Sequence, residues 1–273
     1  MTVLAGRIAD AQAGPVTTLI IRAFVNHYGV NMDEALNPDV ESYRSFNDFF
    51  TRALRLDKRP IAQADYICPA DGVISQLGII SGDQIFQAKR HSYSTTALLG
   101  GDTALAESFQ GGDFATIYLS PKDYHRVHMP CNGRLVRMIY IPGTLFSVNP
   151  RTVRGIPDLF ARNERVICVF ESEEGPFVMA LIGATIVGSI STVWHGIVNP
   201  RNPKRIRETH EWRYEPQDVA LQTGDEMGRF QLGSTVIMLF PKNRLRFNPL
   251  WSPSRMIRFG EMMATSGTTR QDG

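Results

Sequence analysis

Short apolar runs separated by Gly, Pro and Asp dominate the chain from about residue 67 onward. Runs of this length, rich in β-branched and aromatic residues and bounded by turn-forming residues, are typical of β-strands. The runs that we predict to be strands are residues 73–80, 114–120, 133–141, 165–171, 177–183 and 234–240. The pattern therefore predicts a β-rich body of short, mainly antiparallel strands.

Helical signals precede this body. In residues 16–28 apolar side chains recur at helical spacing, and Pro15 suits the first turn of a helix. The residues of this apolar face are Val16, Leu19, Ile20, Ala23, Phe24 and His27. A shorter helical stretch at residues 3–12 comes before it and is broken at Gly14. We expect an amphipathic helical arm that packs on the body, packs on a second subunit, or lies on a membrane surface.

A further helix is expected to begin near Ser45. Asp48 lies three residues after this serine, in the position of a helix start signal, and Phe46, Phe49 and Phe50 are expected to anchor the helix. Because helical signals cluster in the first sixty residues and strand signals follow, the expected class is α+β. We expect a helical arm at residues 1–60, associated with a membrane or a dimer partner, and a β-rich body at residues 61–273.

Residues 177–198 resemble a membrane span in length and composition. The stretch contains no Asp, Glu, Lys or Arg and is long enough to cross a bilayer as a helix. However, Gly183, Gly188 and Gly196 interrupt it, and many of its residues are β-branched. Buried strands joined by tight turns are therefore the favoured interpretation.

Composition is that of an ordinary globular protein. Hydrophobic residues make up 43% and charged residues 21% of the chain, and its mean hydropathy is -0.15, which excludes a disordered chain and a polytopic membrane protein. A formal net charge of +2 is too small to indicate nucleic acid as a partner. The three cysteines, Cys68, Cys131 and Cys168, lie far apart, which fits a reducing compartment and disfavours a thiolate zinc site. The first residues lack a secretory signal, so a cytoplasmic location is the default expectation.

Residues 69–72 and 118–130 carry polar side chains that suit catalysis. Asp71 lies in a Pro-Ala-Asp-Gly turn, where the ordinary role of Asp-Gly is to reverse the chain. His125 and His128 lie three residues apart in the second segment. Prolines bracket these histidines and no HExxH pattern is present, so the spacing does not support a metal site. Histidine is instead the natural proton carrier near neutral pH.

Two further segments complete the candidate chemistry. Residues 143–150 read GTLFSVNP and predict a loop that can line a pocket. Residues 230–240 place Gly233 and Ser234 directly before a β-branched apolar run. A Gly-Ser-Thr sequence at a strand start is common, so this segment alone is a weak signal.

Five segments taken together resemble the phosphatidylserine decarboxylase family. They are PADGVISQLG at residues 69–78, YLSPKDYHRVHMP at 118–130, GTLFSVNP at 143–150, FARNERV at 160–166 and LGSTV at 232–236. The match covers most of the chain from FNDFFTR at residues 46–52 onward. Five segments in one order make the resemblance specific.

The resemblance implies that the chain cleaves itself. In this family the serine of the LGST motif cleaves the peptide bond that precedes it, which here is the Gly233-Ser234 bond. The precursor would give a large chain of residues 1–233 and a small chain of residues 234–273. Ser234 would become a pyruvoyl group, which is the covalent cofactor, and no metal is expected.

The resemblance also implies roles for the candidate residues. Ser234 Oγ would attack the carbonyl of Gly233, His128 would remove the proton, and Asp71 would orient His128. His125 is assigned the handling of a proton or the holding of the substrate during decarboxylation. Because the two histidines are neighbours, they could exchange these roles.

The implied reaction is the decarboxylation of phosphatidylserine to phosphatidylethanolamine and CO2 through a Schiff base to the pyruvoyl group. A diacyl substrate implies a peripheral location on the cytoplasmic side of the cell membrane. The basic stretches 201–207 and 241–259 would then face an anionic membrane surface. The apolar arm makes a homodimer the expected assembly.

Three alternatives remain open at the level of sequence. Ser234, His128 and Asp71 could form an ordinary lipid hydrolase without self-cleavage, although no GxSxG motif is present. The body could also be a lipid-binding module without catalysis. A relative that acts on a soluble amino acid would use the same cofactor, so the headgroup is inferred from resemblance alone.

Overall fold

The computed structural model describes residues 9–88, 91–185, 189–199, 206–215, 217–231 and 234–267. Several parts of the sequence predictions lie outside the described residues. They are residues 3–8 of the first helical stretch, residues 186–188 of the apolar stretch, Leu232 and Gly233 at the expected cleavage bond, and Arg201, Lys204 and Arg205 of the first basic stretch.

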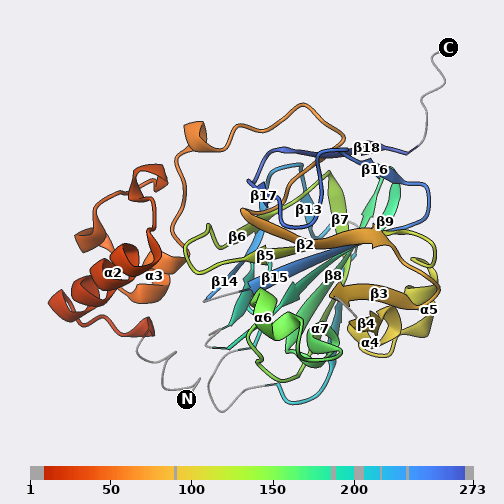
Figure 1. The fold of residues 1–273 in the computed structure, drawn as a ribbon, viewed down its shortest axis with the longest axis horizontal. Helices are drawn as coiled ribbons and strands as arrows, with labels where there is room; N and C mark the ends of the chain where they lie inside the picture. The colour runs from red at the N-terminus through yellow and green to blue at the C-terminus, as the bar shows by residue number, and fades with distance from the viewer. Residues whose placement is uncertain are drawn as a thin grey trace.

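A large antiparallel sheet forms the centre of the body (Figure 1). Its strand order is β12-β7-β8-β9-β15-β5-β2-β17, and β13 pairs with β7. The bounds of these strands are β2 Gly72–Ile79, β5 Asp113–Leu119, β7 Gly133–Ile141, β8 Arg165–Ser172, β9 Gly175–Ile182, β12 His210–Arg213, β13 Ala220–Leu221, β15 Ser234–Phe240 and β17 Met256–Ile257. The predicted strands are confirmed to within two residues at each end, and so is the α+β class.

Both faces of this sheet are buried, which explains why its strands read as nearly continuous apolar runs. Along β15, Val236 and Met238 pack into one hydrophobic cluster, while Ile237 and Leu239 pack into another on the opposite face. The first cluster also contains Val127, Met227 and other residues of the smaller sheets. These sheets have the orders β11-β10-β14-β6 and β1-β18-β16. Their bounds are β1 Tyr66–Ile67, β6 Arg126–His128, β10 Ile190–Thr192, β11 Gly196–Ile197, β14 Glu226–Phe230, β16 Leu245–Phe247 and β18 Met262–Ser266.

Short helices and a hairpin cover the other face of the large sheet (Figure 1). The elements on this side are β3 Gln84–Ala88, β4 His91–Ser94, α4 Thr95–Leu98, α5 Thr103–Glu107, α6 Pro150–Val153 and α7 Leu159–Arg162. Tyr93, Leu98, Val153 and Phe160 from these elements are buried against it. Strand β15 therefore lies inside the body, covered on both faces and paired along both edges.

The apolar stretch at residues 177–198 forms strands, as predicted. It runs through β9 and continues into β10 and β11. Among the described residues, no helix is both long enough and apolar enough to cross a bilayer.

The N-terminal arm forms a separate small cluster beside the body (Figure 1). Helix α2 spans Pro15–Tyr28 and helix α3 spans Phe46–Phe50, with single 3-10 turns at Met32–Glu34, Val40–Ser42 and Leu56–Lys58. Ile21 of α2 packs with Phe46, Phe49 and Phe50 of α3, and all four side chains are buried. The predicted start at Ser45 is confirmed, because the Ser45 hydroxyl accepts a hydrogen bond from the Asp48 N–H at 3.1 Å.

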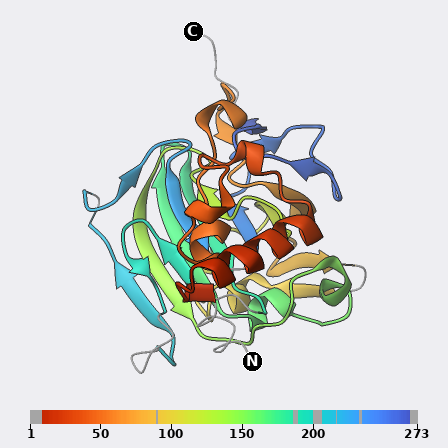
Figure 2. The same cartoon turned by 90° about the vertical axis from the view of Figure 1, so that its left-hand side faces the viewer.

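Helix α2 forms as expected, but its packing face is offset from the predicted apolar face. Ile21, Phe24 and Val25 point toward the arm's cluster. Val16 and Leu19 remain 57% and 68% exposed, respectively. Figure 2 shows α2 lying on the outside of the molecule. The arm thus presents an apolar strip that the described chain does not cover.

Candidate active site

Ser234 opens the central strand β15 and is fully buried. It pairs with Leu119 at the end of β5, and the next residue, Thr235, pairs with Ile182 of β9. Side chains alternate along a strand, so Ser234 faces the same cluster as Val236, on the side where β6 and β14 pack. Its Oγ has no hydrogen-bond partner among the described residues. Burying a hydroxyl without a hydrogen-bond partner costs free energy. Because no described residue binds this oxygen, it is available to take part in chemistry.

His125 lies beside the segment that leads into Ser234. The N–H of Phe230 donates to the backbone oxygen of His125 at 3.0 Å, which extends the pairing of β6 with β14. The imidazole Nδ1 donates to the backbone oxygen of Asp123 at 2.8 Å, since a carbonyl can only accept. This bond fixes the lone pair on Nε2, which is buried and has no partner among the described residues.

Burial makes His125 difficult to protonate. The ring of Phe50 lies 4.0 Å from the imidazole ring, measured between centroids, and the side chain is fully enclosed. Burial lowers the pKa of His125 to about 3; the hydrogen bond to Asp123 opposes this shift, and the positive charge of Arg52 adds to it. His125 is therefore a neutral imidazole at physiological pH.

His128 occupies a more polar environment than His125. Its Nδ1 donates to the backbone oxygen of Gly224 at 2.8 Å, and the hydroxyl of Tyr124 donates to Nε2 at 3.0 Å. Burial lowers the pKa of His128, while the hydrogen bond to Gly224 and the charges of Glu226 and Asp71 oppose the shift. The ring can thus accept a proton on Nε2 with less penalty than His125 can.

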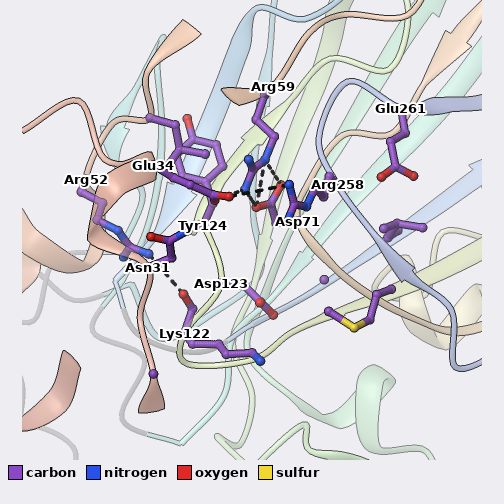
Figure 3. Close-up of a pocket in the computed structure, with 15 residues that line it drawn as sticks. Asn31, Glu34, Arg52, Arg59, Asp71, Lys122, Asp123, Tyr124, Arg258 and Glu261 are labelled. Atoms are coloured by element: carbon purple, nitrogen blue, oxygen red, sulfur yellow. Dashed lines mark hydrogen bonds and ion pairs between the residues drawn. The ribbon is translucent and has the colours of Figure 1, made fainter. Parts of the chain in front are cut away.

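Asp71 is held by an arginine from the N-terminal arm. Arg59 donates to both carboxylate oxygens, from Nε at 2.9 Å and from Nη2 at 2.5 Å (Figure 3). Arg59 also donates to Glu34 at 2.7 Å. The N–H of Phe259 donates to Asp71 Oδ1 at 2.9 Å. Bidentate pairing of this kind is among the stronger polar contacts in proteins.

Phe259 links two of the predicted site residues. Its N–H binds Asp71, and its ring stacks on His128 with 3.7 Å between centroids and 15° between planes. The structure therefore brings Asp71 and His128 together across one residue. No hydrogen bond among the described residues joins Asp71, His128 and Ser234 directly.

The sheet also brings Asp71 to the same end as Ser234. Val73 pairs with Tyr118, and Tyr118 pairs with Thr235, so the segments before β2 and β15 flank the end of β5. Neighbouring strands are about 4.8 Å apart, which puts the backbones of these two segments roughly 10 Å apart. Gly72 allows this close packing, because a Cβ atom there would lie 2.4 Å from the Tyr118 carbonyl oxygen.

Asn163 joins two of the sequence motifs. Its amide nitrogen donates to the carbonyl oxygens of Phe146 and Gly183, and its amide oxygen accepts from the N–H of Phe146. The segments 143–150 and 160–166 are therefore held as one structural unit. Val148 and Pro150 help to line a pocket of about 190 Å³, as expected for the first of these loops.

A second pocket, of about 250 Å³, lies between the arm and the body and reaches Asp71 and Tyr124 (Figure 3). Sequence reasoning missed the residues that shape it, above all Arg52, Arg59 and Tyr124. Arg52 stands in the FNDFFTR segment, so the family match marked its position but gave no partner. Within the described ranges, no cluster of three or more His, Cys, Asp or Glu residues suits a metal ion, and Cys68, Cys131 and Cys168 are free thiols.

The buried neutral state of His125 predicts a specific acid sensitivity. Between pH 6.5 and about 3, the unfolded chain binds a proton at this position that the folded chain does not, so stability falls as pH falls. We expect His125→Gln to reduce the loss of unfolding free energy between pH 6.5 and pH 5 by about 1.5 kcal/mol. Urea unfolding measures this in chains that also carry Ser234→Ala, so that each remains a single chain.

The matched control is His27→Gln, at an exposed position on α2. An equal pH dependence for the His125→Gln and His27→Gln chains would contradict the assignment.

Comparison with known proteins identifies the family of the chain. The model of the family described as "Phosphatidylserine decarboxylase" matches residues 46–265, and a second model, described as "PSD", matches residues 1–29. A protein of Nitrosospira multiformis named phosphatidylserine decarboxylase proenzyme is 71% identical over 97% of this chain and 92% of its own length. Proteins with the same name from Dechloromonas aromatica and Herminiimonas arsenicoxydans are 66% and 64% identical over 97% of this chain, and the match covers 93% and 89% of their lengths. The chain therefore belongs to the phosphatidylserine decarboxylase family.

Proposed function

We propose that this chain cleaves itself between Gly233 and Ser234 and then decarboxylates phosphatidylserine to phosphatidylethanolamine and CO2. The relatives are named proenzymes, which fits an enzyme that matures by cleavage. The observation that carries the proposal is the Ser234 hydroxyl, which is buried and unpartnered among the described residues at the first position of the central strand. A hydroxyl held in this way is suited to attack the bond that precedes it once a base removes its proton.

His128 is the base best suited to that step. The base becomes an imidazolium when it takes the proton from Ser234, and negative groups must stabilise that charge. The charges of Glu226 and Asp71 favour a positive His128 and outnumber the opposing charge of Arg126, whereas the one charge that acts on His125, that of Arg52, opposes a positive His125. For the transfer, the Tyr124 hydroxyl must release the lone pair of His128 Nε2.

Asp71 supports this base through charge and position. Its carboxylate is shared with Arg59 and lies across Phe259 from His128. Two shifts would let Asp71 bind His128: Arg59 would move toward Glu34, which already accepts from the same guanidinium, and the His128 Nδ1–H would leave the Gly224 carbonyl. Asp71 thus acts as the orienting group of the Ser-His-Asp arrangement.

The cofactor that we propose is a pyruvoyl group derived from Ser234, and the site fits it. Pairing with Leu119 and Ile182 holds the start of β15 in place, so the new chain terminus stays inside the body after cleavage. The carbonyl of a pyruvoyl group supplies the electron sink that amino-acid side chains lack. Nε2 of His125 has no partner among the described residues, so it is available to hold or move a proton during turnover.

Association with a membrane follows from the diacyl substrate. Val16, Leu19 and Ile20 leave an apolar strip on the outside of the arm, and Arg22 lies on the same helix. We propose that this strip lies in the anionic cytoplasmic face of the cell membrane as a peripheral contact. The expected homodimer remains a prediction.

Replacement of the nucleophile tests the cleavage. Ser234→Ala removes the attacking oxygen, so the chain should stay intact and should release no CO2 from phosphatidylserine. Intact mass spectrometry of the denatured wild-type protein should show two chains, which end and begin at the Gly233-Ser234 bond. Ser234 lies inside a folded strand, so Ser234→Thr serves as a conservative control for folding.

The two histidines separate cleavage from turnover. His128→Gln should leave the chain uncleaved, while His125→Gln should yield both chains but release less than about 1% of the wild-type CO2, in line with the usual contribution of general acid-base catalysis. If His125→Gln blocked cleavage and His128→Gln blocked only CO2 release, the roles of the two histidines would be exchanged. An intact, unmodified wild-type chain that releases CO2 would contradict the proposal as a whole.

The membrane contact is tested on the arm. Leu19→Glu places a charge in the apolar strip and should weaken binding to vesicles of phosphatidylserine and phosphatidylglycerol by about tenfold or more. Vesicle cosedimentation measures the partitioning. Ile79→Glu, at a residue of β2 that is 69% exposed, is the matched control and should bind as the wild-type protein does. Equal binding by both variants would exclude the strip as the contact.

A further inference from the structure

Arg52 is a buried cation on the wall of the pocket between the arm and the body. It follows helix α3 and is only 5% exposed. Its guanidinium carbon lies 5.2 Å from the centre of the Phe49 ring, and Nη2 donates to the backbone oxygen of Lys122 at 3.1 Å. Nε and Nη1 are enclosed and have no acceptor among the described residues.

The acids of the same pocket have other partners. Asp71 and Glu34 both bind Arg59, and Asp123 accepts from the N–H and the hydroxyl of Ser120 at 2.7 Å. The fourth acid of the pocket, Glu261, lies 3.9 Å from Arg255. No salt bridge between described residues includes Arg52. A buried charge without a counterion is costly, so this position is built for an anion that the chain itself does not supply.

Two further cations face the same pocket (Figure 3). Lys122 is exposed and also lacks a salt bridge among the described residues, and Arg258 lies 3.6 Å from Glu34 with a side chain that is 61% exposed. A guanidinium and a nearby ammonium are the groups that proteins use to bind phosphate. The pocket thus offers one enclosed and two accessible positive charges beside Asp71 and Tyr124.

We infer that Arg52, assisted by Lys122, binds the phosphodiester of the substrate headgroup. The inference rests on the proposed function and names the part of phosphatidylserine that this pocket recognises. The ring of Phe50, two residues before Arg52, packs against the ring of His125, so the arm holds the anion site next to the histidine assigned to turnover. The arm therefore contributes a wall of the active site as well as a membrane contact.

The phosphodiester fits this site better than the substrate carboxylate does. During decarboxylation the negative charge leaves the carboxylate, so a cation fixed on that group would stabilise the ground state more than the transition state. The phosphodiester keeps its charge throughout the reaction. A cation bound to it therefore lowers KM without a penalty on kcat.

Three variants test the inference. Arg52→Gln should still be cleaved into two chains, but its KM for short-chain phosphatidylserine should rise about 10- to 100-fold with kcat within about threefold, the range expected when a charge-assisted hydrogen bond is lost. Arg52→Lys should recover part of the affinity. Arg55→Gln, at an exposed arginine that pairs with Asp57, should behave as the wild-type enzyme does.

Two soluble probes distinguish the headgroup anions in the wild-type enzyme. Glycerophosphocholine carries a phosphodiester and a quaternary ammonium but no carboxylate, while betaine carries the carboxylate and the ammonium without phosphate. Glycerophosphocholine should inhibit competitively, and Arg52→Gln should weaken this inhibition by the same factor as it raises KM. Betaine should have little effect on either enzyme.

Several outcomes would overturn the inference. They are an unchanged KM in cleaved Arg52→Gln, inhibition of the wild-type enzyme by betaine rather than glycerophosphocholine, and equal effects of Arg52→Gln and Arg55→Gln. If Arg52→Gln does not fold, Arg52→Lys takes its place, and a KM and an inhibition by glycerophosphocholine equal to those of the wild-type enzyme would overturn the inference. A wild-type chain that neither cleaves nor releases CO2 would instead refute the proposed function.

Discussion

The pairing of β15 with β5 and β9 is the constraint on which the rest of the site depends. All of its residues from Ser234 to Phe240 are buried, and both edges of the strand are hydrogen-bonded. Such a strand keeps its place through burial and pairing, even when the covalent bond before it is cut. The same burial and pairing would hold Ser234 as the proposed nucleophile and, after the proposed cleavage, as the new chain terminus.

Charge at the boundary between arm and body forms the second layer of the site. The arm supplies Arg52 and Arg59, and the body supplies Asp71 and the loop that carries Lys122 and His125. Because Arg59 binds Asp71 and Glu34 together, the position of the arm and the electrostatics of the predicted base are linked. The lipid contact that we propose for the arm would thus be linked to the chemistry of the body through these ion pairs.

The sequence predicted those features that depend on local pattern. The strand from Ser234 to Phe240 was predictable because Gly233 bounds its apolar run. The start of α3 was predictable from Ser45 and Asp48. The face of α2 was only partly predictable. Helical spacing identifies apolar positions, but which of them pack is decided by the phenylalanines of α3.

The polar contacts of the site could not be predicted in the same way. The hydrogen bond from the Phe259 N–H to Asp71 joins residues that are 188 positions apart in the sequence. Nothing in the sequence around Arg59, LDKRP at residues 56–60, shows that this arginine binds the Asp71 carboxylate. Motif order indicated that Asp71, His128 and Ser234 gather in one region, and the sheet brings their segments together. The tautomers of the two histidines and the difference in their burial could be assigned only from the structure.

The central claim is that a ketone at the start of the small chain accepts the electrons released by decarboxylation. Borohydride reduction of the purified two-chain enzyme, followed by assay of CO2 from carboxyl-labelled phosphatidylserine and mass analysis of the small chain's first residue, tests it directly. CO2 release should disappear in proportion to the conversion of the terminal pyruvoyl group to lactoyl. Full release of CO2 after complete reduction would contradict it.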